Sequence, residues 1–232
     1  MEEKKPKKKL KYALRGMLCL LLVYVGYIVL TIPDVKKLPP LKNGDLVFQT
    51  TMDVQSWAVI FASGSPFTHM GMIKLTKRGP VVVEAVGPVK ETPLQDWMVR
   101  EFAMRASIKR MKGLSEGDAQ AALAAAKREY GKPYDIYFLP DDKAYYCSEL
   151  VHDSFDRAGV PLGNVEKVGA LGQSMAMDKI IESRWQNYPP CRKSGMTLEK
   201  CRKIIMEQPL VTPASIARDD RMETIWSNYP FD

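Results

Sequence analysis

Short apolar runs that end at turn-forming residues predict four strands in the chain. They are NGDLVFQT (residues 43–50), FTHMGMIKL (67–75), GPVVVEAVG (79–87) and FAMRASIKRM (102–111). The segment TKRG between the second and third runs predicts a hairpin. Helical spacing predicts a short helix capped by Asp53 that stops at Gly64, a long helix over 115–131, and a third over 147–158. Beyond Val160 the pattern weakens into short helices and loops. A few strands flanked by helices indicate an α+β domain.

An uncharged apolar stretch, MLCLLLVYVGYIVLTI (residues 17–32), precedes this domain. It is just long enough to span a bilayer, and it extends to Tyr12 if the Arg15 side chain reaches the headgroups. The alternative is a cleaved secretion signal, whose apolar region of about 7–15 residues ends at small residues. Because this stretch runs into Thr31-Ile32-Pro33 instead, we expect an uncleaved transmembrane helix. A proline-rich linker (residues 33–42) and the domain proper (43–232) follow it.

The positive charge is concentrated at the amino terminus. Residues 1–16 hold seven cationic residues against Glu2 and Glu3, which gives +5 of the net +7, and the remaining 216 residues carry +2. A basic tail before an apolar span indicates a membrane partner and argues against a nucleic acid. By the positive-inside rule residues 1–16 lie in the cytoplasm. We therefore expect a single-pass inner-membrane protein with its domain on the outer, in a bacterium periplasmic, side.

The four cysteines fall in different settings. Cys19 lies in the apolar span, and Cys147 opens a predicted helix. Cys191 and Cys201 bracket the segment RKSGMTLEK. In an oxidising compartment that pair could close an eleven-residue loop and contribute about 2–3 kcal/mol, whereas two free thiols are an equally good interpretation. Since the chain has two histidines and no Cys-x-x-Cys, we expect no structural zinc site and no cofactor.

Cys147 stands at the head of the predicted helix in AYYCSELVHDSF. A buried cysteine that only fills space is the ordinary case. The dipole and the N–H groups of a helix amino terminus, however, lower the pKa of a thiol and can bind an oxyanion. Glu149 lies two residues on, about 200° around the helix, so we expect it to face away from the thiol. The position makes Cys147 a candidate nucleophile.

A thiol nucleophile needs a base, and the chain offers only His69 and His152. His152 lies five residues past Cys147, about 140° around the same helix, so we interpret it as a surface or helix-packing residue. His69 lies in a strand, where a papain-like site places its base, although a lone strand histidine is often structural. Glu84 is the one carboxylate in the valine strand VVVEAVG, and an imidazolium would satisfy it there. An edge-strand glutamate facing water is the alternative.

Five segments resemble the circularly permuted papain-like (NlpC-like) amidases of the YiiX/YaeF type, relatives of NlpC-type cell-wall peptidases and of lecithin:retinol acyltransferase. They are NGDLVFQT, SPFTHMGMIKL, VVVEAVGPVKETPLQDW, GKPYDIYFLPDDKAYYCSELV and LVTPASIARDD, within residues 43–220. In unpermuted relatives the cysteine helix precedes the histidine strand, whereas here the order is reversed. The resemblance implies a small antiparallel sheet packed against helices. It also implies Cys147 as the nucleophile, His69 as the base and Glu84 as the group that orients it. Tyr134 resembles a tyrosine that helps to stabilise the oxyanion, with Tyr145 and Tyr146 as neighbours in sequence.

We therefore expect a membrane-anchored cysteine hydrolase that cleaves an amide or ester bond without a cofactor. Two substrate classes stay open. Cell-wall peptides suit the compartment and the NlpC-type relatives, whereas acyl or lipid-linked molecules suit the anchor and the apolar segment WAVIFASGSPF before His69, which is otherwise ordinary core. The alternative function is a catalytically silent lipid- or peptide-binding module that uses the same cleft. The sequence does not indicate an oligomeric state.

Overall fold

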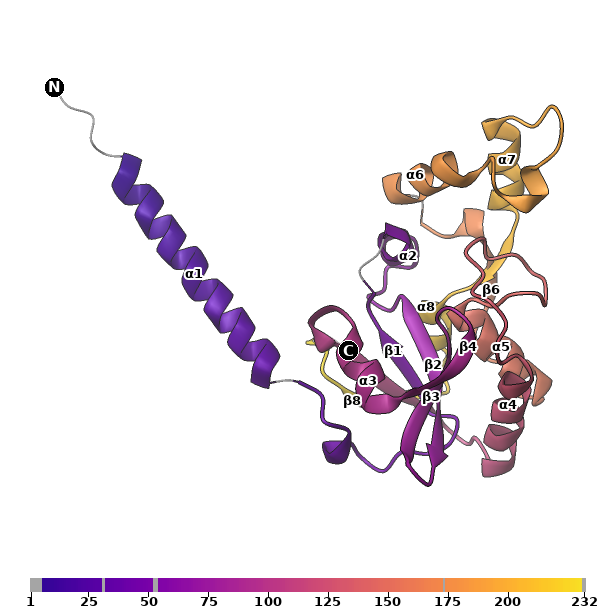
Figure 1. The fold of residues 1–232 in the computed structure, drawn as a ribbon, viewed down its shortest axis with the longest axis horizontal. Helices are drawn as coiled ribbons and strands as arrows, with labels where there is room; N and C mark the ends of the chain where they lie inside the picture. Colours follow the sequence, from indigo (N-terminus) through magenta and orange to yellow (C-terminus); the bar gives the residue numbers. More distant parts are fainter. Residues whose placement is uncertain (1–5, 31, 52–53, 173, 231–232) are drawn as a thin grey trace.

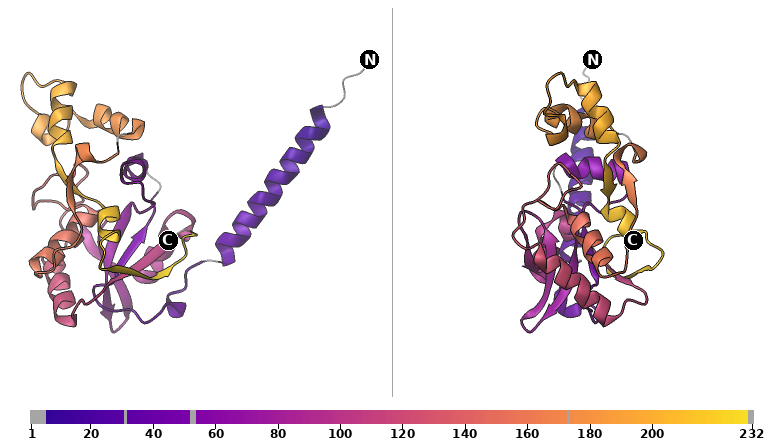
Figure 2. Two further views of the ribbon diagram at one scale, coloured as in Figure 1. Left: turned by 180° about the vertical axis from the view of Figure 1, so that it is seen from behind. Right: turned by 90° about the vertical axis from the view of Figure 1, so that its right-hand side faces the viewer.

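The computed structural model describes residues 6–30, 32–51, 54–172 and 174–230. A long helix, α1 (Pro6–Leu30), extends away from an α+β domain (Figures 1 and 2). Residues 17–30 of the apolar span lie in α1, which also includes part of the basic tail. The stretch Leu10–Leu30 is long and apolar enough to cross a membrane, and none of it is buried. Its 21 residues correspond to about 31 Å of helix, close to the thickness of a bilayer's hydrocarbon core.

The centre of the domain is a six-stranded antiparallel sheet in the order β4-β3-β2-β1-β5-β8. The strands are β1 (Leu46–Gln49), β2 (His69–Thr76), β3 (Gly79–Ala85), β4 (Val89–Pro93), β5 (Ala106–Met111) and β8 (Met222–Ser227). Four of them match the predicted strands. The two edge strands of this sheet, β4 and β8, were not predicted, and β8 lies beyond Val160, where only short helices and loops were expected. Edge strands are hard to recognise because they need little apolar surface, and β4 carries two charged residues and a proline.

Helices cover both faces of the sheet (Figure 1). One face packs against α4 (Glu116–Arg128) and α5 (Cys147–Arg157), and the other against α3 (Leu94–Arg100) and the linker. Strand β1 shows the alternation, since Leu46 and Phe48 face the α4–α5 layer and Val47 faces α3. The predicted α+β class, a small antiparallel sheet packed against helices, is therefore confirmed.

The predicted helix boundaries follow local capping. Ser115 caps α4, where its Oγ accepts a hydrogen bond from the Asp118 N–H at 3.1 Å. Helix α5 begins at Cys147, as the sequence predicts. Helix α2 (Val54–Ser63) matches the predicted short apolar helix, and its expected cap, Asp53, lies outside the described residues.

Gly71 allows the hairpin of β2 and β3 to bring a histidine beside a glutamate. The register pairs Met72 with Val83, so Gly71 lies opposite Glu84, and His69 shares that face of the sheet. A Cβ atom at Gly71 would lie 2.4 Å from Cγ1 of Val82 and 2.7 Å from the Val83 carbonyl oxygen. Any larger residue would push the two strands apart. The glycine therefore leaves the space through which the two side chains meet.

Between α5 and β8 the chain forms a smaller, mainly helical layer, most of which lies above the sheet (Figure 1). It contains α6 (Met175–Arg184), α7 (Leu198–Met206) and α8 (Pro213–Ala217), together with a short two-stranded sheet of β6 (Val165–Lys167) and β7 (Pro209–Val211). Four single 3₁₀ turns complete the described elements: η1 (Val35–Lys37), η2 (Phe102–Met104), η3 (Val168–Ala170) and η4 (Pro189–Cys191).

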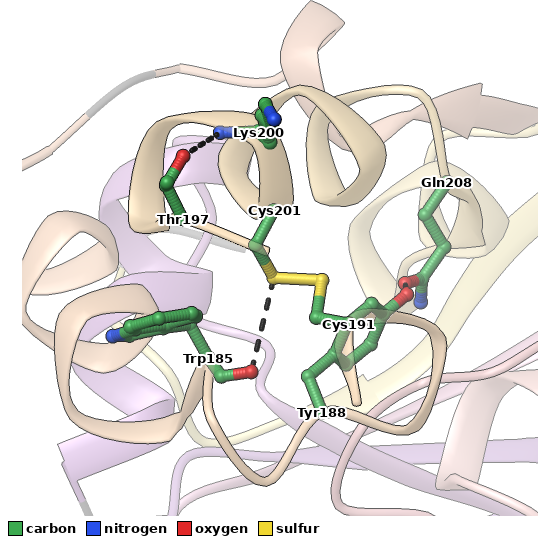
Figure 3. The surroundings of a disulfide bond; sticks show 7 residues. All are labelled: Trp185, Tyr188, Cys191, Thr197, Lys200, Cys201 and Gln208. Carbon is green, nitrogen blue, oxygen red and sulfur yellow. Dashed lines mark hydrogen bonds between the residues drawn. A yellow bond between two sulfur atoms is a disulfide. The ribbon is translucent and has the colours of Figure 1, made fainter. Parts of the chain in front are cut away.

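Cys191 and Cys201 form a disulfide within this layer, which decides between the two interpretations of the pair (Figure 3). The bridge lies in a small apolar cluster with Tyr188. The Tyr188 hydroxyl bonds to Oε1 of Gln208, whose Nε2 donates to the carbonyl oxygens of Tyr137, at 3.1 Å, and Phe138. The bridge therefore supports the loop before α5, which includes Tyr134 and Phe138.

Candidate active site

Cys147 is the first residue of α5 and is buried. Its Sγ lies 3.9 Å from the Thr68 carbonyl oxygen, directly before β2. Strand β2 packs against α5, so the amino end of the helix lies beside the amino end of the strand. The thiol is therefore placed where helix N–H groups point and where the next residue of the strand is His69.

His69 connects Cys147 with Glu84. Its Nε2 lies 2.7 Å from Oε2 of Glu84, and its ring also forms a hydrogen bond with the Cys147 side chain. Both His69 and Glu84 are buried. Because Nε2 faces the carboxylate, Nδ1 is the nitrogen left for the thiol. The structure thus brings Cys147, His69 and Glu84 together in one hydrogen-bonded series from three separate elements.

The electrostatics of this series favour an ion pair. Burial alone would lower the pKa of His69, but the hydrogen bonds to Cys147 and Glu84 outweigh it and raise that pKa to about 9. Burial would raise the pKa of the Cys147 thiol, whereas the hydrogen bond and positive charge of His69 lower it below the ordinary value, with help from the Met70 N–H and Ser148. These shifts favour the charged form of both groups, thiolate and imidazolium.

Four side chains form hydrogen bonds with the Glu84 carboxylate. His69 and the Trp97 indole N–H bond to Oε2, the Thr92 hydroxyl donates to Oε1 at 2.6 Å, and the Arg100 guanidinium donates to both oxygens at 2.9 Å. Burial would raise the pKa of Glu84, but the hydrogen bonds from Arg100, His69 and Thr92 hold it far below its usual range. The carboxylate is therefore charged, fixed and fully buried.

The sequence did not identify Thr92, Trp97 and Arg100 as partners of Glu84. Trp97 and Arg100 are three residues apart in α3, on one face of that helix, and this spacing was the available signal. The spacing indicated that both side chains lie on one face of the helix, but it did not indicate which strand that face would cover. Thr92 gave no signal, because it lies in the unpredicted edge strand β4.

Glu149 turns back toward the start of α5 and accepts a hydrogen bond from the Tyr146 N–H at 3.3 Å. Burial raises the pKa of Glu149 to about 9, even though that hydrogen bond lowers it. The group is therefore protonated at neutral pH. From the helical spacing, Glu149 was expected to face away from the thiolate and therefore not to repel it. Its burial gives a second reason, because a protonated carboxyl group carries no charge that could repel the thiolate.

His152 lies away from the thiol. Its Nδ1 donates to the Leu162 carbonyl oxygen at 2.6 Å, which ties the middle of α5 to the loop that follows it. This contact agrees with the interpretation of His152 as a helix-packing residue.

The Cys147–His69 pair opens into a cavity of about 290 Å³. Polar side chains of Thr51, Ser56 and Thr68 lie near the pair, and the rest of the wall is largely apolar, including Val59, Ala62, Leu171, Met177, Ile180 and Leu210. Tyr134 also lines the cavity, together with Tyr146. The Tyr146 hydroxyl accepts a hydrogen bond from the Val211 N–H at 3.2 Å, and the Tyr145 hydroxyl accepts one from Arg157 at 3.0 Å.

A buried cysteine at a helix amino terminus, facing a strand histidine that a carboxylate orients, is the arrangement of papain-like thiol hydrolases. In this chain the histidine and the carboxylate come from β2 and β3, before the cysteine helix, which is the permuted order. A family model of the permuted papain-like amidases, the YaeF/YiiX or C92 family, matches residues 40–226, and the chain belongs to this family. The family match supports a hydrolase function of the cysteine type.

Two relatives agree with the family match. The protein YiiX of Escherichia coli (strain K12) is 30% identical over 193 residues, which cover 82% of this chain and 88% of that protein. A crystal structure described as the metalloprotein YiiX from Escherichia coli O157:H7 is 29% identical with a TM-score of 0.71, and the match covers 82% of this chain and 98% of that one. The permuted papain-like fold expected from the sequence is therefore confirmed.

Proposed function

We propose that the protein is a membrane-anchored cysteine hydrolase that cleaves an amide or ester bond through Cys147, His69 and Glu84. The observation that carries this proposal is the hydrogen-bonded series of these three buried side chains at the wall of a cavity. A catalytically silent binding module would not need a thiol whose pKa is lowered by a neighbouring imidazolium. The charged Glu84 supports the imidazolium, and the lowered pKa of the thiol supports nucleophilic attack.

In the proposed reaction the Cys147 thiolate attacks the substrate carbonyl carbon and forms a tetrahedral adduct. The Cys147 N–H at the amino end of α5 stabilises the oxyanion, with the Tyr134 hydroxyl as a second donor. His69 gives its proton to the leaving amine or alcohol, which leaves a thioester on Cys147. Neutral His69 then takes a proton from water, and the resulting hydroxide releases the acid and restores the thiolate.

The substrate class rests on the cavity. Its apolar wall suits an acyl chain better than a charged peptide stem, and the polar groups near Cys147 would face the scissile bond. An acyl amide or acyl ester is therefore the first substrate we propose, and a cell-wall peptide is the second. The related crystal structure is described as that of a metalloprotein. Among the residues that the structure describes here, no three His, Cys, Asp or Glu side chains stand together as metal ligands, so no step uses a metal.

A panel of acyl and peptidyl electrophilic probes tests the proposal. We expect the full chain to be modified at Cys147, and acyl probes to react faster than peptidyl probes. Mass spectrometry of the digested protein locates the modified residue, and Cys19 serves as the internal control because it is the other free cysteine that the structure describes. Labelling of Cys19 alone, or equal labelling of both thiols by every probe, would refute a hydrolytic Cys147.

We also propose that α1 remains in the mature protein as a membrane anchor, with residues 1–16 in the cytoplasm. The length and apolar character of Leu10–Leu30 and the basic residues before it support this orientation. Protease added to spheroplasts should digest the domain and spare the amino-terminal tail. A mature protein that begins near Pro33 would mean that the apolar segment is a cleaved signal.

A further inference from the structure

Helix α2 is apolar on two opposite faces. Its inner face carries Ser56, Val59 and Ala62, which line the cavity of Cys147. Trp57 and Phe61, four residues apart, lie on the opposite side of the helix, where they are 43% and 60% exposed. Their rings stack on each other with centroids 6.2 Å apart. A helix that is apolar all round is normally buried, yet this one presents its aromatic pair to the outside of the domain.

The sequence of α2 and of the residues that follow it is also uncharged. Residues 54–68, which include all of α2 and the approach to β2, contain no Asp, Glu, Lys or Arg. Helix α6, which packs against α2, begins with Met175, and that side chain is 80% exposed. Exposed aromatic and long apolar side chains without charges are typical of surfaces that enter the headgroup and acyl boundary of a bilayer, where tryptophan is enriched.

The direction of α1 places this surface on the membrane side. In Figure 1 the end of the domain that carries α2 and α6 lies toward the amino terminus of α1, and both views of Figure 2 agree. The other end of α1 contacts the domain, where the Arg105 guanidinium lies 4.5 Å from the centroid of the Tyr27 ring. If α1 crosses a bilayer, its amino-terminal direction is the direction of the membrane. The end of the domain that carries α2 and α6 then lies on the membrane side.

We propose that the outer face of α2, formed by Trp57 and Phe61, docks into the lipid bilayer that α1 spans. The opposite face of the same helix walls the Cys147 cavity, so the docked helix brings that cavity to the membrane surface. Substrate would then reach the cavity from the lipid phase. This inference rests on the proposed anchor and not on the chemistry at Cys147.

Quenching of tryptophan fluorescence by brominated lipid tests the docking. The full chain is reconstituted in vesicles of phosphatidylglycerol and phosphatidylcholine, with bromine on the acyl chains of the latter. Helix α1 contains no tryptophan, so the anchor itself contributes no signal. We expect the wild-type protein to lose emission, and Trp57→Phe to lose distinctly less. Trp97 is buried, and Trp185 and Trp226, the latter in a pocket with Tyr27 of α1, contribute the same background quenching to both proteins. Equal quenching of the two proteins would overturn the inference.

Matched variants separate docking from general hydrophobicity. Phe61→Ser should weaken the quenching of Trp57, whereas Leu75→Ser, at a similarly exposed apolar residue on β2, should leave it at the wild-type level. Quenching that both variants reduce equally would overturn the inference. The inference would also be overturned if brominated lipid did not quench Trp57 but its emission changed with the density of protein in the vesicles. That result would mean that a second copy of the chain covers α2.

Two parallel measurements distinguish the possible failures. Vesicle flotation reports on the anchor, and a chain that floats with an unquenched Trp57 overturns docking alone. A chain that does not float overturns the anchor and the docking together. Turnover of a water-soluble ester on the same vesicles reports on Cys147, so quenching without turnover would support docking and contradict the proposed hydrolase.

Discussion

Replacing Cys147 by alanine is expected to lower kcat/KM for a water-soluble activated ester, 4-nitrophenyl acetate, by about 10⁴-fold or more, because the nucleophile is lost. His69→Ala should cost nearly as much, because Cys147 then loses the cation that stabilises its thiolate, and the acyl-enzyme loses the base that activates water. Residues that act as a unit give losses that do not add, so the double variant should be no worse than either single one. Steady-state kinetics of the purified full chain in detergent measure these losses.

His152→Ala is the matched control for His69→Ala. Its ring bonds to the Leu162 carbonyl oxygen in the loop after α5, away from the thiol, so the variant should keep most of the activity. Loss of that hydrogen bond should reduce stability by about 1 kcal/mol. Similar losses of activity in the two histidine variants would mean that the site is misplaced.

Replacing Glu84 by alanine is expected to have the largest effect on stability. It removes a fully buried charge and leaves the Arg100 guanidinium, the Trp97 N–H and the Thr92 hydroxyl without their acceptor. Breaking a buried ion pair from one side costs about 3–5 kcal/mol. Chemical denaturation of the full chain, followed by circular dichroism, should show a loss of this size in the free energy of unfolding.

Glu91 provides the control for this prediction. It also lies on the sheet and pairs with Lys74 at 2.7 Å, but its side chain is 31% exposed. Glu91→Ala should therefore cost about 1 kcal/mol or less. Glu84→Gln keeps the shape of the side chain and should fold, which allows its activity to be measured. The NH₂ group of the new amide cannot accept the hydrogen bonds that the carboxylate oxygen accepted from its neighbours. We therefore expect an intermediate loss of stability and activity. If Glu84→Ala and Glu91→Ala are equally stable, the buried network around Glu84 contributes little.

Much of the site was predictable because its geometry is local. The helix-like run over residues 147–158 predicted where α5 begins, and the angular steps around that helix separated His152 from Cys147. A carboxylate among valines identified Glu84, because a buried charge requires a partner. The resemblance to the permuted papain-like amidases connected His69 with Cys147, which spacing alone does not do. The catalytic roles of Cys147, His69, Glu84 and Tyr134 remain predictions.

The remaining features depend on tertiary contacts that no local pattern records. Arg100 and Trp97 surround Glu84 only because α3 folds back over the face of β3. The exposed pair on α2 was interpreted as ordinary core, since an apolar sequence does not show which of its faces is covered. The disulfide was left open because spacing permits Cys191 and Cys201 to pair without requiring it. The approach of the two cysteines depends on the fold around Tyr188.

The acidity of the Cys147 thiol tests the central claim most directly, because a space-filling cysteine and a nucleophile differ in this property. The rate of iodoacetamide labelling at Cys147 is measured against pH in the wild-type protein and in His69→Ala and Glu84→Gln. Mass spectrometry follows Cys147 separately from Cys19.

We expect the wild-type rate to rise with a midpoint well below the free-thiol pKa of about 8.5. His69→Ala should move the midpoint up to that value or beyond it, because burial then acts on the thiol without the opposing cation. Glu84→Gln should move it less, since Glu84 acts through the imidazole. A wild-type midpoint at or above about 8.5 that neither substitution changes would contradict the account and return Cys147 to the core as a structural residue.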